Sequence, residues 1–139
     1  MTFFNINDLL DELYFDFKQK IIKDNIGIEF IKQDNNSLAF PFILSDKTRV
    51  YQIIDNFIDN AIKNTKQGFI EFGYSFDYEG DNKIIFYVKD TGCGIKKENF
   101  EIIFDRFRQI STGHNRAIQG NGLGLAICRG LAEALNGKI

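Results

Sequence analysis

Apolar residues recur every three or four positions in three stretches of this chain, a spacing that predicts three amphipathic helices. The predicted helices span residues 5–23, 46–65 and 123–135. Asn5 or Asn7 is a suitable cap for the first helix, and Ser45 or Asp46 for the second, because these side chains accept hydrogen bonds from free backbone N–H groups. Gly137 is the natural stop of the third helix.

Stretches in which apolar and polar residues alternate predict strands between the helices. Residues 26–32 form one such stretch, and two further β-rich runs cover residues 68–78 and 81–90. Gly80 and Asn82 in the intervening turn favour a tight reversal, so the two runs are predicted to pair as an antiparallel hairpin.

The region after the hairpin has a weaker pattern. A short helical stretch is predicted near residues 97–107, and residues 108–121 show no period and contain several glycines. An aperiodic loop of this length in a compact domain is usually functional or mobile. Helices and antiparallel strands in this order predict an α+β fold arranged as a layered sandwich.

Size and composition limit the possible functions. With 139 residues, the chain has room for one domain over residues 1–139. Its formal net charge of −2 argues against a general nucleic-acid binder, which needs a positive face. Cys93 and Cys128 have neither metal-ligand spacing nor a disulfide framework, which favours a reducing cytosol. No apolar run approaches the ~20 residues of a membrane span, so an intracellular domain is expected.

The second predicted helix carries a polar stripe. Asn56, Asn60 and Lys63 are spaced by four and three residues, which places them on one narrow face. An amide oxygen is a neutral ligand suited to Mg²⁺, and a lysine one turn further on can meet a phosphate. The alternative is a polar face that is simply solvated.

Two glycine-rich segments add candidate chemistry. Asp90 ends a strand and begins "DTGCGI", where a carboxylate can accept a hydrogen bond from a flat ligand such as adenine; the alternative is a simple turn. "GNGLGL" precedes the third helix, and its backbone N–H groups suit an anion; the alternative is a flexible hinge. The spacing of Gly120, Gly122 and Gly124 matches neither the Walker motif nor the dinucleotide fingerprint.

Four segments in order resemble the conserved boxes of the ATP-binding catalytic domain of sensor histidine kinases. These segments are "RVYQIIDNFIDNAIKNT", "DTGCGI", "IFDRFRQ" and "GNGLGLAICRGLAEALNGKI". The wider family, known for its GHKL or Bergerat ATP-binding fold, also contains type II topoisomerases, MutL-type repair proteins and a class of chaperones. The resemblance implies a two-layer α/β sandwich in which a mixed sheet packs against about three helices.

The resemblance also implies ATP and Mg²⁺ as cofactors and gives the motifs their roles. Asn60 is expected to coordinate Mg²⁺, and Asp90 to bind the adenine amino group. Asn56, Lys63 and Arg106 are expected to contribute to catalysis near the phosphates. The residues expected to bind the nucleotide are Asn60, Asn64, Asp90, Gly92, Gly94, Ile95, Gly120, Gly122, Leu123 and Gly124.

Three features depart from the family's pattern. Asn64 stands where the family often has an aromatic residue near adenine, and Gln119 replaces the leading glycine of the last box. The sequence stops at Ile139, where the family continues into a closing pair of strands. We therefore expect a domain without its last strands and with an unpaired sheet edge. The loop over residues 108–121 is expected to form the lid of the site.

Asn56 distinguishes two branches of the family. The branch that hydrolyses ATP has a glutamate four residues before the metal-binding asparagine, where it acts as the base for water. An amide cannot take a proton at neutral pH, so Asn56 favours transfer of the γ-phosphoryl group over hydrolysis. The resemblance thus implies an ATP-dependent protein-histidine kinase of two-component signal transduction.

The expected partners are a histidine-containing dimerisation domain of the same protein and a response regulator downstream. His114 precedes Asn115 in the lid and does not fit the acceptor pattern, so this chain is not expected to phosphorylate itself. No nucleic acid and no direct membrane contact are expected for this cytoplasmic domain, and a membrane anchor is left open for the full-length protein. The alternatives are an ATP-binding sensing or docking module without phosphotransfer, and a serine kinase acting on anti-sigma-type partners.

Overall fold

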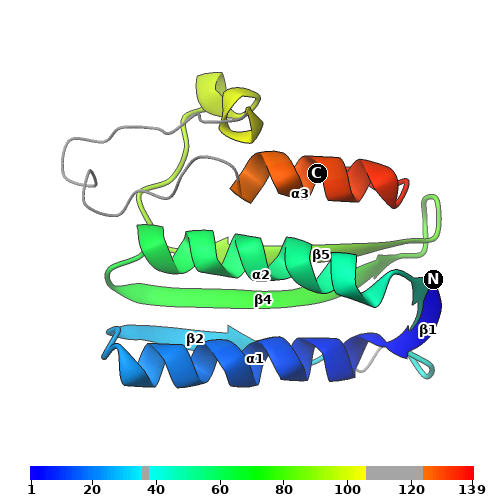
Figure 1. Cartoon of the computed structure of the whole chain (residues 1–139), viewed down its shortest axis with the longest axis horizontal. Coiled ribbons are helices and arrows are strands. Elements are labelled where there is room, and N and C mark those ends of the chain that lie inside the picture. The colour runs from blue at the N-terminus through cyan, green and yellow to red at the C-terminus, as the bar shows by residue number, and fades with distance from the viewer. Residues whose placement is uncertain (36–37, 106–123) are drawn as a thin grey trace.

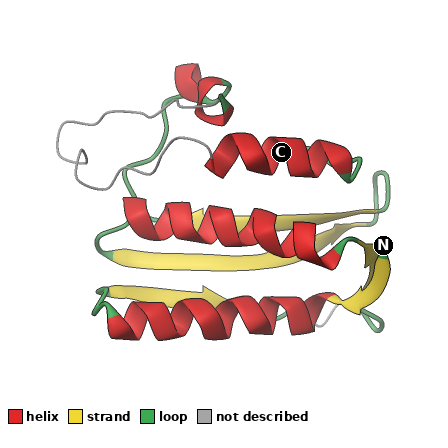
Figure 2. Cartoon of the chain, viewed as in Figure 1, coloured by secondary structure: helices red, strands yellow, loops and turns green. Residues whose placement is uncertain are grey.

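The structure is a computed structural model, and it describes residues 1–35, 38–105 and 124–139. Helices α1 (Ile6–Lys23) and α2 (Lys47–Asn64) cover one face of a three-stranded sheet, and α3 (Gly124–Ala134) packs alongside α2 (Figure 1). Figure 2 shows α1 and α2 running alongside the strands. The predicted sandwich of a mixed sheet and about three helices is therefore confirmed.

The main sheet has the strand order β2-β4-β5, and its strands are β2 (Ile28–Lys32), β4 (Gly68–Asp77) and β5 (Lys83–Asp90). β2 and β4 are parallel, whereas β4 and β5 form the predicted antiparallel hairpin. Asp77 pairs with Lys83 at the closed end of the hairpin, and the left-handed residue of its loop is Asn82, with φ 52°. This pairing places the end of β5 beside the start of β4.

A second, two-stranded sheet was not predicted. Its strands, β1 (Thr2–Asn5) and β3 (Phe42–Ser45), pair antiparallel at the start of α1. Each has four residues, too few for an alternating pattern to be distinguished from chance. Two short 3₁₀ helices, η1 (Lys97–Asn99) and η2 (Ile102–Phe104), occupy the stretch where a helix was predicted near residues 97–107.

The structure decides which residues cap the helices. Asn5 caps α1 by accepting a hydrogen bond from the Asn7 N–H at 2.8 Å, and Asp46 caps α2 in the same way. Gly137 is not the left-handed residue after α3: Asn136 takes that conformation with φ 59°, because asparagine also tolerates it. The Gly137 N–H instead closes the turn on the Ala132 carbonyl at 2.8 Å.

The hydrophobic core lies between the helices and the main sheet. α1 contributes the apolar stripe that its sequence predicts, and α2 contributes a similar face that includes Ile54 and Ile58. The rings of Tyr14, Phe30 and Phe72 form a continuous stack, with centroid distances of 5.5 and 5.2 Å. This stack joins α1, β2 and β4, so the sheet is held firmly against the first helix.

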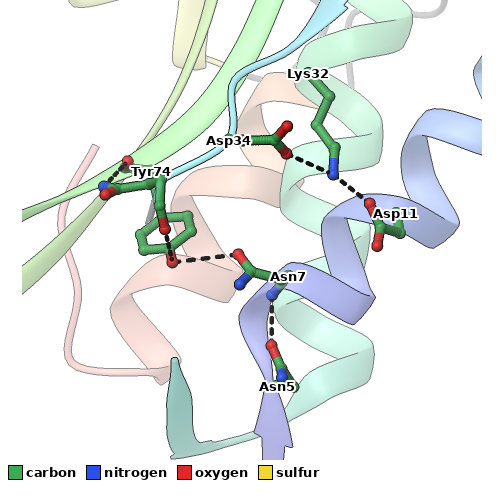
Figure 3. A network of polar contacts seen from close by, with 7 residues as sticks. Asn5, Asn7, Asp11, Lys32, Asp34 and Tyr74 are labelled. Carbon is green, nitrogen blue, oxygen red and sulfur yellow. Dashed lines mark hydrogen bonds and ion pairs between the residues drawn. The ribbon is translucent and has the colours of Figure 1, made fainter. Parts of the chain in front are cut away.

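A polar network connects the start of α1 to the middle of β4 (Figure 3). The buried Tyr74 hydroxyl lies 3.2 Å from both the Asn7 side-chain oxygen and the Asn35 carbonyl, and it can donate to either. The Asn35 amide in turn donates to the Tyr74 carbonyl at 2.9 Å. Among the described residues, no helix is long and apolar enough to cross a membrane.

Candidate functional site

The C-terminal half of α2 presents a row of amides beside its buried face. Ile58, Ala61 and Ile62 pack into the core, which leaves Asn60 and Asn64 half-buried on the adjoining face. The Asn64 side-chain nitrogen donates to the Asn60 backbone carbonyl at 2.8 Å and lies 3.4 Å from the Asn60 side-chain oxygen. The amide oxygen of Asn60 thus lies one turn before the C-terminal end of α2, beside the side chain of Asn64.

The loop after β5 is fixed by its own polar groups. The Asp90 carboxylate accepts a hydrogen bond from the Gly92 N–H at 2.8 Å. The Thr91 hydroxyl accepts from the Phe69 N–H at 3.0 Å, and the Thr91 N–H donates to the Phe69 carbonyl at 3.2 Å. Thr91 therefore anchors the loop to β4, a role that the sequence analysis did not assign although the residue stands inside the motif.

The two predicted motifs meet where this loop passes the end of α2. A Cβ added at Gly92 would lie 2.6 Å from the Asn64 backbone carbonyl oxygen and 2.8 Å from an Asp90 carboxylate oxygen. A side chain does not fit at such distances, so the close approach requires glycine. The contact brings Asp90 and Asn64, which are far apart in sequence, to one place. Gly94 follows with φ 73°, and Ile95 beyond it is exposed.

The start of α3 faces Asn56. A Cβ added at Gly124 would lie 3.8 Å from the Asn56 side-chain oxygen. One turn further along α3, the buried Cys128 thiol lies 3.7 Å from the Ile53 carbonyl. Burial raises the pKa of Cys128 to about 11, against a smaller lowering by a hydrogen bond from Asn56. The end of the glycine run thus lies over the first amide of the predicted stripe, and Cys128 is an unreactive packing residue.

The Lys63 ammonium group, expected near the phosphates, is paired with a carboxylate of its own helix. This carboxylate is that of Asp59, at 2.8 Å, and Lys20 from α1 pairs with the same residue at 3.0 Å. Burial alone would raise the pKa of Asp59, but its hydrogen bonds with Lys63 and Lys20 outweigh this and lower it. The predicted phosphate ligand therefore has a carboxylate partner within its own helix.

The structure brings together only part of the predicted site. Asn60, Asn64, Asp90 and Gly92 converge at the junction of α2 with the β5 loop, and Asn56 and Gly124 face each other one to two turns away. Several predicted residues lie outside the described residues, namely Arg106, Gly120, Gly122, Leu123 and the lid over residues 108–121.

Thr65 is a second residue that the sequence analysis did not single out. It follows α2 directly, the residue is 2% exposed, and its hydroxyl has no hydrogen-bond partner in the part of the chain that the structure describes. Burying an unpaired hydroxyl costs about 1–3 kcal/mol. No sequence signal marks this residue, because a threonine at the end of a helix is usually solvated or paired.

Residues 45–139 match the family described as histidine kinase-, DNA gyrase B-, and HSP90-like ATPases. The chain belongs to this family. It is 34% identical over 131 residues to the sensor protein SrrB of Staphylococcus aureus strain NCTC 8325 / PS 47. The match covers 94% of this chain and 21% of SrrB, so the chain spans about a fifth of the length of that relative.

Solved structures agree with this membership. The catalytic domain of histidine kinase ThkA superposes with a TM-score of 0.73 at 36% identity, over 96% of this chain and 80% of that one. Full-length ShkA in complex with AMPPNP gives a TM-score of 0.76 at 30% identity, over 97% of this chain and 26% of that one. ThkA in complex with the response regulator TrrA gives 0.73 at 33% identity, with 98% and 35% covered.

Replacing Gly92 by alanine tests the close approach of the loop to α2. The new methyl group would overlap the Asn64 carbonyl, so Gly92→Ala is expected to lower the free energy of unfolding by about 1–3 kcal/mol. Gly130→Ala is the matched control, because Gly130 lies inside α3 with nothing within 4 Å of an added Cβ. That change should raise the free energy of unfolding by about 0.5–1 kcal/mol. Urea unfolding measures both, and equal effects of the two changes would contradict the contact.

Proposed function

We propose that this chain binds ATP as a magnesium complex at the junction of the end of α2 with the loop after β5. The contact between Gly92 and the Asn64 carbonyl carries the proposal, because it places Asp90 beside the amides of α2. Glycine at this point allows the loop after β5 to pass directly against the end of α2. Membership of an ATPase family supports a nucleotide as that ligand.

Asp90 suits the base of the nucleotide. One of its carboxylate oxygens is occupied by the Gly92 N–H, which fixes the orientation of the side chain. Within the described residues, the other oxygen accepts no hydrogen bond, so it is available to the six-amino group of adenine. Gly94, Ile95 and Asn64 would line the same part of the site.

Asn60 suits the metal. Its side-chain oxygen is a hard neutral donor that is only weakly engaged, at 3.4 Å from the Asn64 nitrogen. Mg²⁺ takes few protein ligands when phosphates and water supply the rest, and a bound ion would supply positive charge to those phosphates. We assign the phosphate end to Gly124 and Lys63, together with the residues outside the described ranges: Arg106, Gly120, Gly122 and Leu123.

Transfer of the γ-phosphoryl group is favoured over hydrolysis because Asn56 has no basic atom. Its amide faces Gly124 and Cys128, so it can donate or accept a hydrogen bond near the phosphates but cannot remove a proton from water. In the full-length protein, we propose, the phosphoryl group passes to a histidine on a separate dimerisation domain and then to a response regulator. The complex of the relative ThkA with the response regulator TrrA supports a response regulator as a partner. The use of ATP favours a cytoplasmic site of action.

Replacing Asp90 by asparagine tests the adenine assignment. The change keeps the shape but removes a charged acceptor, so the affinity for ATP is expected to fall about 10- to 100-fold. Asp81→Asn is the control, because Asp81 lies in the loop at the opposite end of the same hairpin, paired with Lys83. Calorimetric titration of both variants measures the affinities. Unchanged binding by Asp90→Asn would contradict the assignment.

Reconstitution with a phosphoacceptor tests the kinase activity. We expect this chain, mixed with Mg²⁺-ATP and a histidine-bearing dimerisation domain, to transfer labelled γ-phosphate to the histidine, and expect no label on this chain alone. A variant acceptor with the histidine replaced by glutamine is the control. Tight ATP binding without transfer to any candidate acceptor would contradict the kinase assignment and favour a nucleotide-sensing or docking module.

A further inference from the structure

Asp59 is shared by two lysines from different helices. Lys63, four residues later on α2, lies 2.8 Å from one carboxylate oxygen, and Lys20 of α1 lies 3.0 Å from the other. The Asp59 side chain is 30% exposed, whereas the side chain of Lys20 is 45% exposed and that of Lys63 is 43% exposed. The carboxylate is therefore the most buried member of a three-charge cluster that holds the predicted phosphate ligand.

The position of Lys63 on α2 allows its ammonium group to reach two different partners. Lys63 lies four residues after Asp59 and three after Asn60, and both spacings bring side chains together on a helix. Asp59 faces α1, whereas Asn60 faces the proposed nucleotide site. A long flexible lysine side chain can therefore pair with the carboxylate or with a phosphate held near Asn60, but not with both fully.

The negative charge of Asp59 is stabilised by its two lysine partners, because the other side chains that line the same groove are acidic or aromatic. Asp59 lines an open groove between α1 and α2, together with Asp16, Phe17, Lys20, Tyr51 and Asp55. The Tyr51 hydroxyl donates to Asp16 at 2.8 Å, and within the part of the chain that the structure describes, the cations paired with Asp59 are Lys20 and Lys63. Burial, and next the charge of Asp59, raise the pKa of Asp55. If both lysines left, Asp59 would be a half-buried carboxylate beside another one.

We propose that Asp59 competes with the nucleotide for Lys63, and that Lys20 acts as the positioning residue that makes Lys63 available. When Lys63 turns to a phosphate, Lys20 stays on Asp59 and keeps its charge paired. Without Lys20, the departure of Lys63 would leave the carboxylate unpaired, so Lys63 would stay. This inference rests on the proposed function, and it assigns to α1 a part in binding phosphates although α1 lies outside the four sequence boxes.

Nucleotides with and without phosphates separate this effect from binding of the base. Lys20→Met keeps an unbranched side chain but removes the charge, and should weaken ATP binding about two- to five-fold. Asp59→Asn should strengthen ATP binding by a similar factor. Neither change should alter the affinity for adenosine, which has no phosphate. Lys63→Met should weaken ATP binding and also spare adenosine.

Two controls and a double-mutant cycle exclude a general effect of charge. Lys18→Met removes a charge two residues from Lys20, on the opposite face of α1, and Asp81→Asn removes a carboxylate from the loop at the far end of the hairpin; both should leave the ATP affinity unchanged. In a Lys63→Met background, the effects of Lys20→Met and Asp59→Asn should disappear, because no lysine is left to release. Circular dichroism melting verifies that each variant is folded.

The other possible results distinguish a failure of this inference from a failure of the proposed function. Effects of Lys20→Met and Asp59→Asn that persist in the Lys63→Met background would overturn the inference in favour of direct charge attraction. Full ATP affinity of Lys63→Met would also overturn it, while leaving the base assignment of Asp90 untouched. Failure of the unmodified chain to bind ATP and adenosine at all would instead contradict the proposed function. Calorimetry on these variants therefore distinguishes the two failures.

Discussion

The close passage of the loop after β5 across the end of α2 is the contact on which the site depends. Gly92 lies so near the Asn64 carbonyl that only glycine fits, and the Thr91 hydroxyl and backbone hold the loop to β4. This passage converts two separate sequence motifs into one surface. It needs the hairpin register as well, since that register brings Asp90 opposite Ile70, near the start of β4.

Three faces of α2 contact three different parts of the structure. Its apolar face, with Ile54 and Ile58, packs into the core and fixes the helix against the sheet. Its amide face, from Asn56 to Asn64, is directed to α3 and to the β5 loop. Its acidic face is directed to α1, and Asp59 on this face forms an ion pair with Lys20 of α1. A rotation of the helix that improved one face would displace the other two, so packing in the core determines the geometry of the site.

Periodicity predicted most of the fold because long elements repeat their pattern often enough to be read. The three helices and the hairpin were predicted for this reason, and the structure confirms them. β1 and β3 were missed because four residues show too little pattern, and their pairing depends on contacts distant in sequence. Gly137 was predicted as the stop of the third helix; α3 ends at Ala134, and the left-handed residue after it is Asn136, because asparagine also tolerates that conformation.

The site was less predictable than the fold. Sequence order placed Asn60 and Asp90 in the same pocket only through resemblance, and the structure supplies the contact that joins their motifs. Spacing put Lys63 on the stripe with Asn56 and Asn60, but spacing cannot say which neighbour a flexible cation chooses. The partner Asp59, held also by Lys20 from another helix, is a tertiary feature. The unpaired hydroxyl of Thr65 is likewise visible only after packing is known.

If the end of α2 and the loop after β5 form one nucleotide site, both segments must respond to the same ligand. A titration of the isotope-labelled chain with Mg²⁺-ATP, followed by nuclear magnetic resonance, tests it most directly. We expect the side-chain amide signals of Asn60 and Asn64 and the backbone signal of Gly92 to shift together, with a single affinity. Shifts confined to one of the two segments, or different affinities for each, would contradict it.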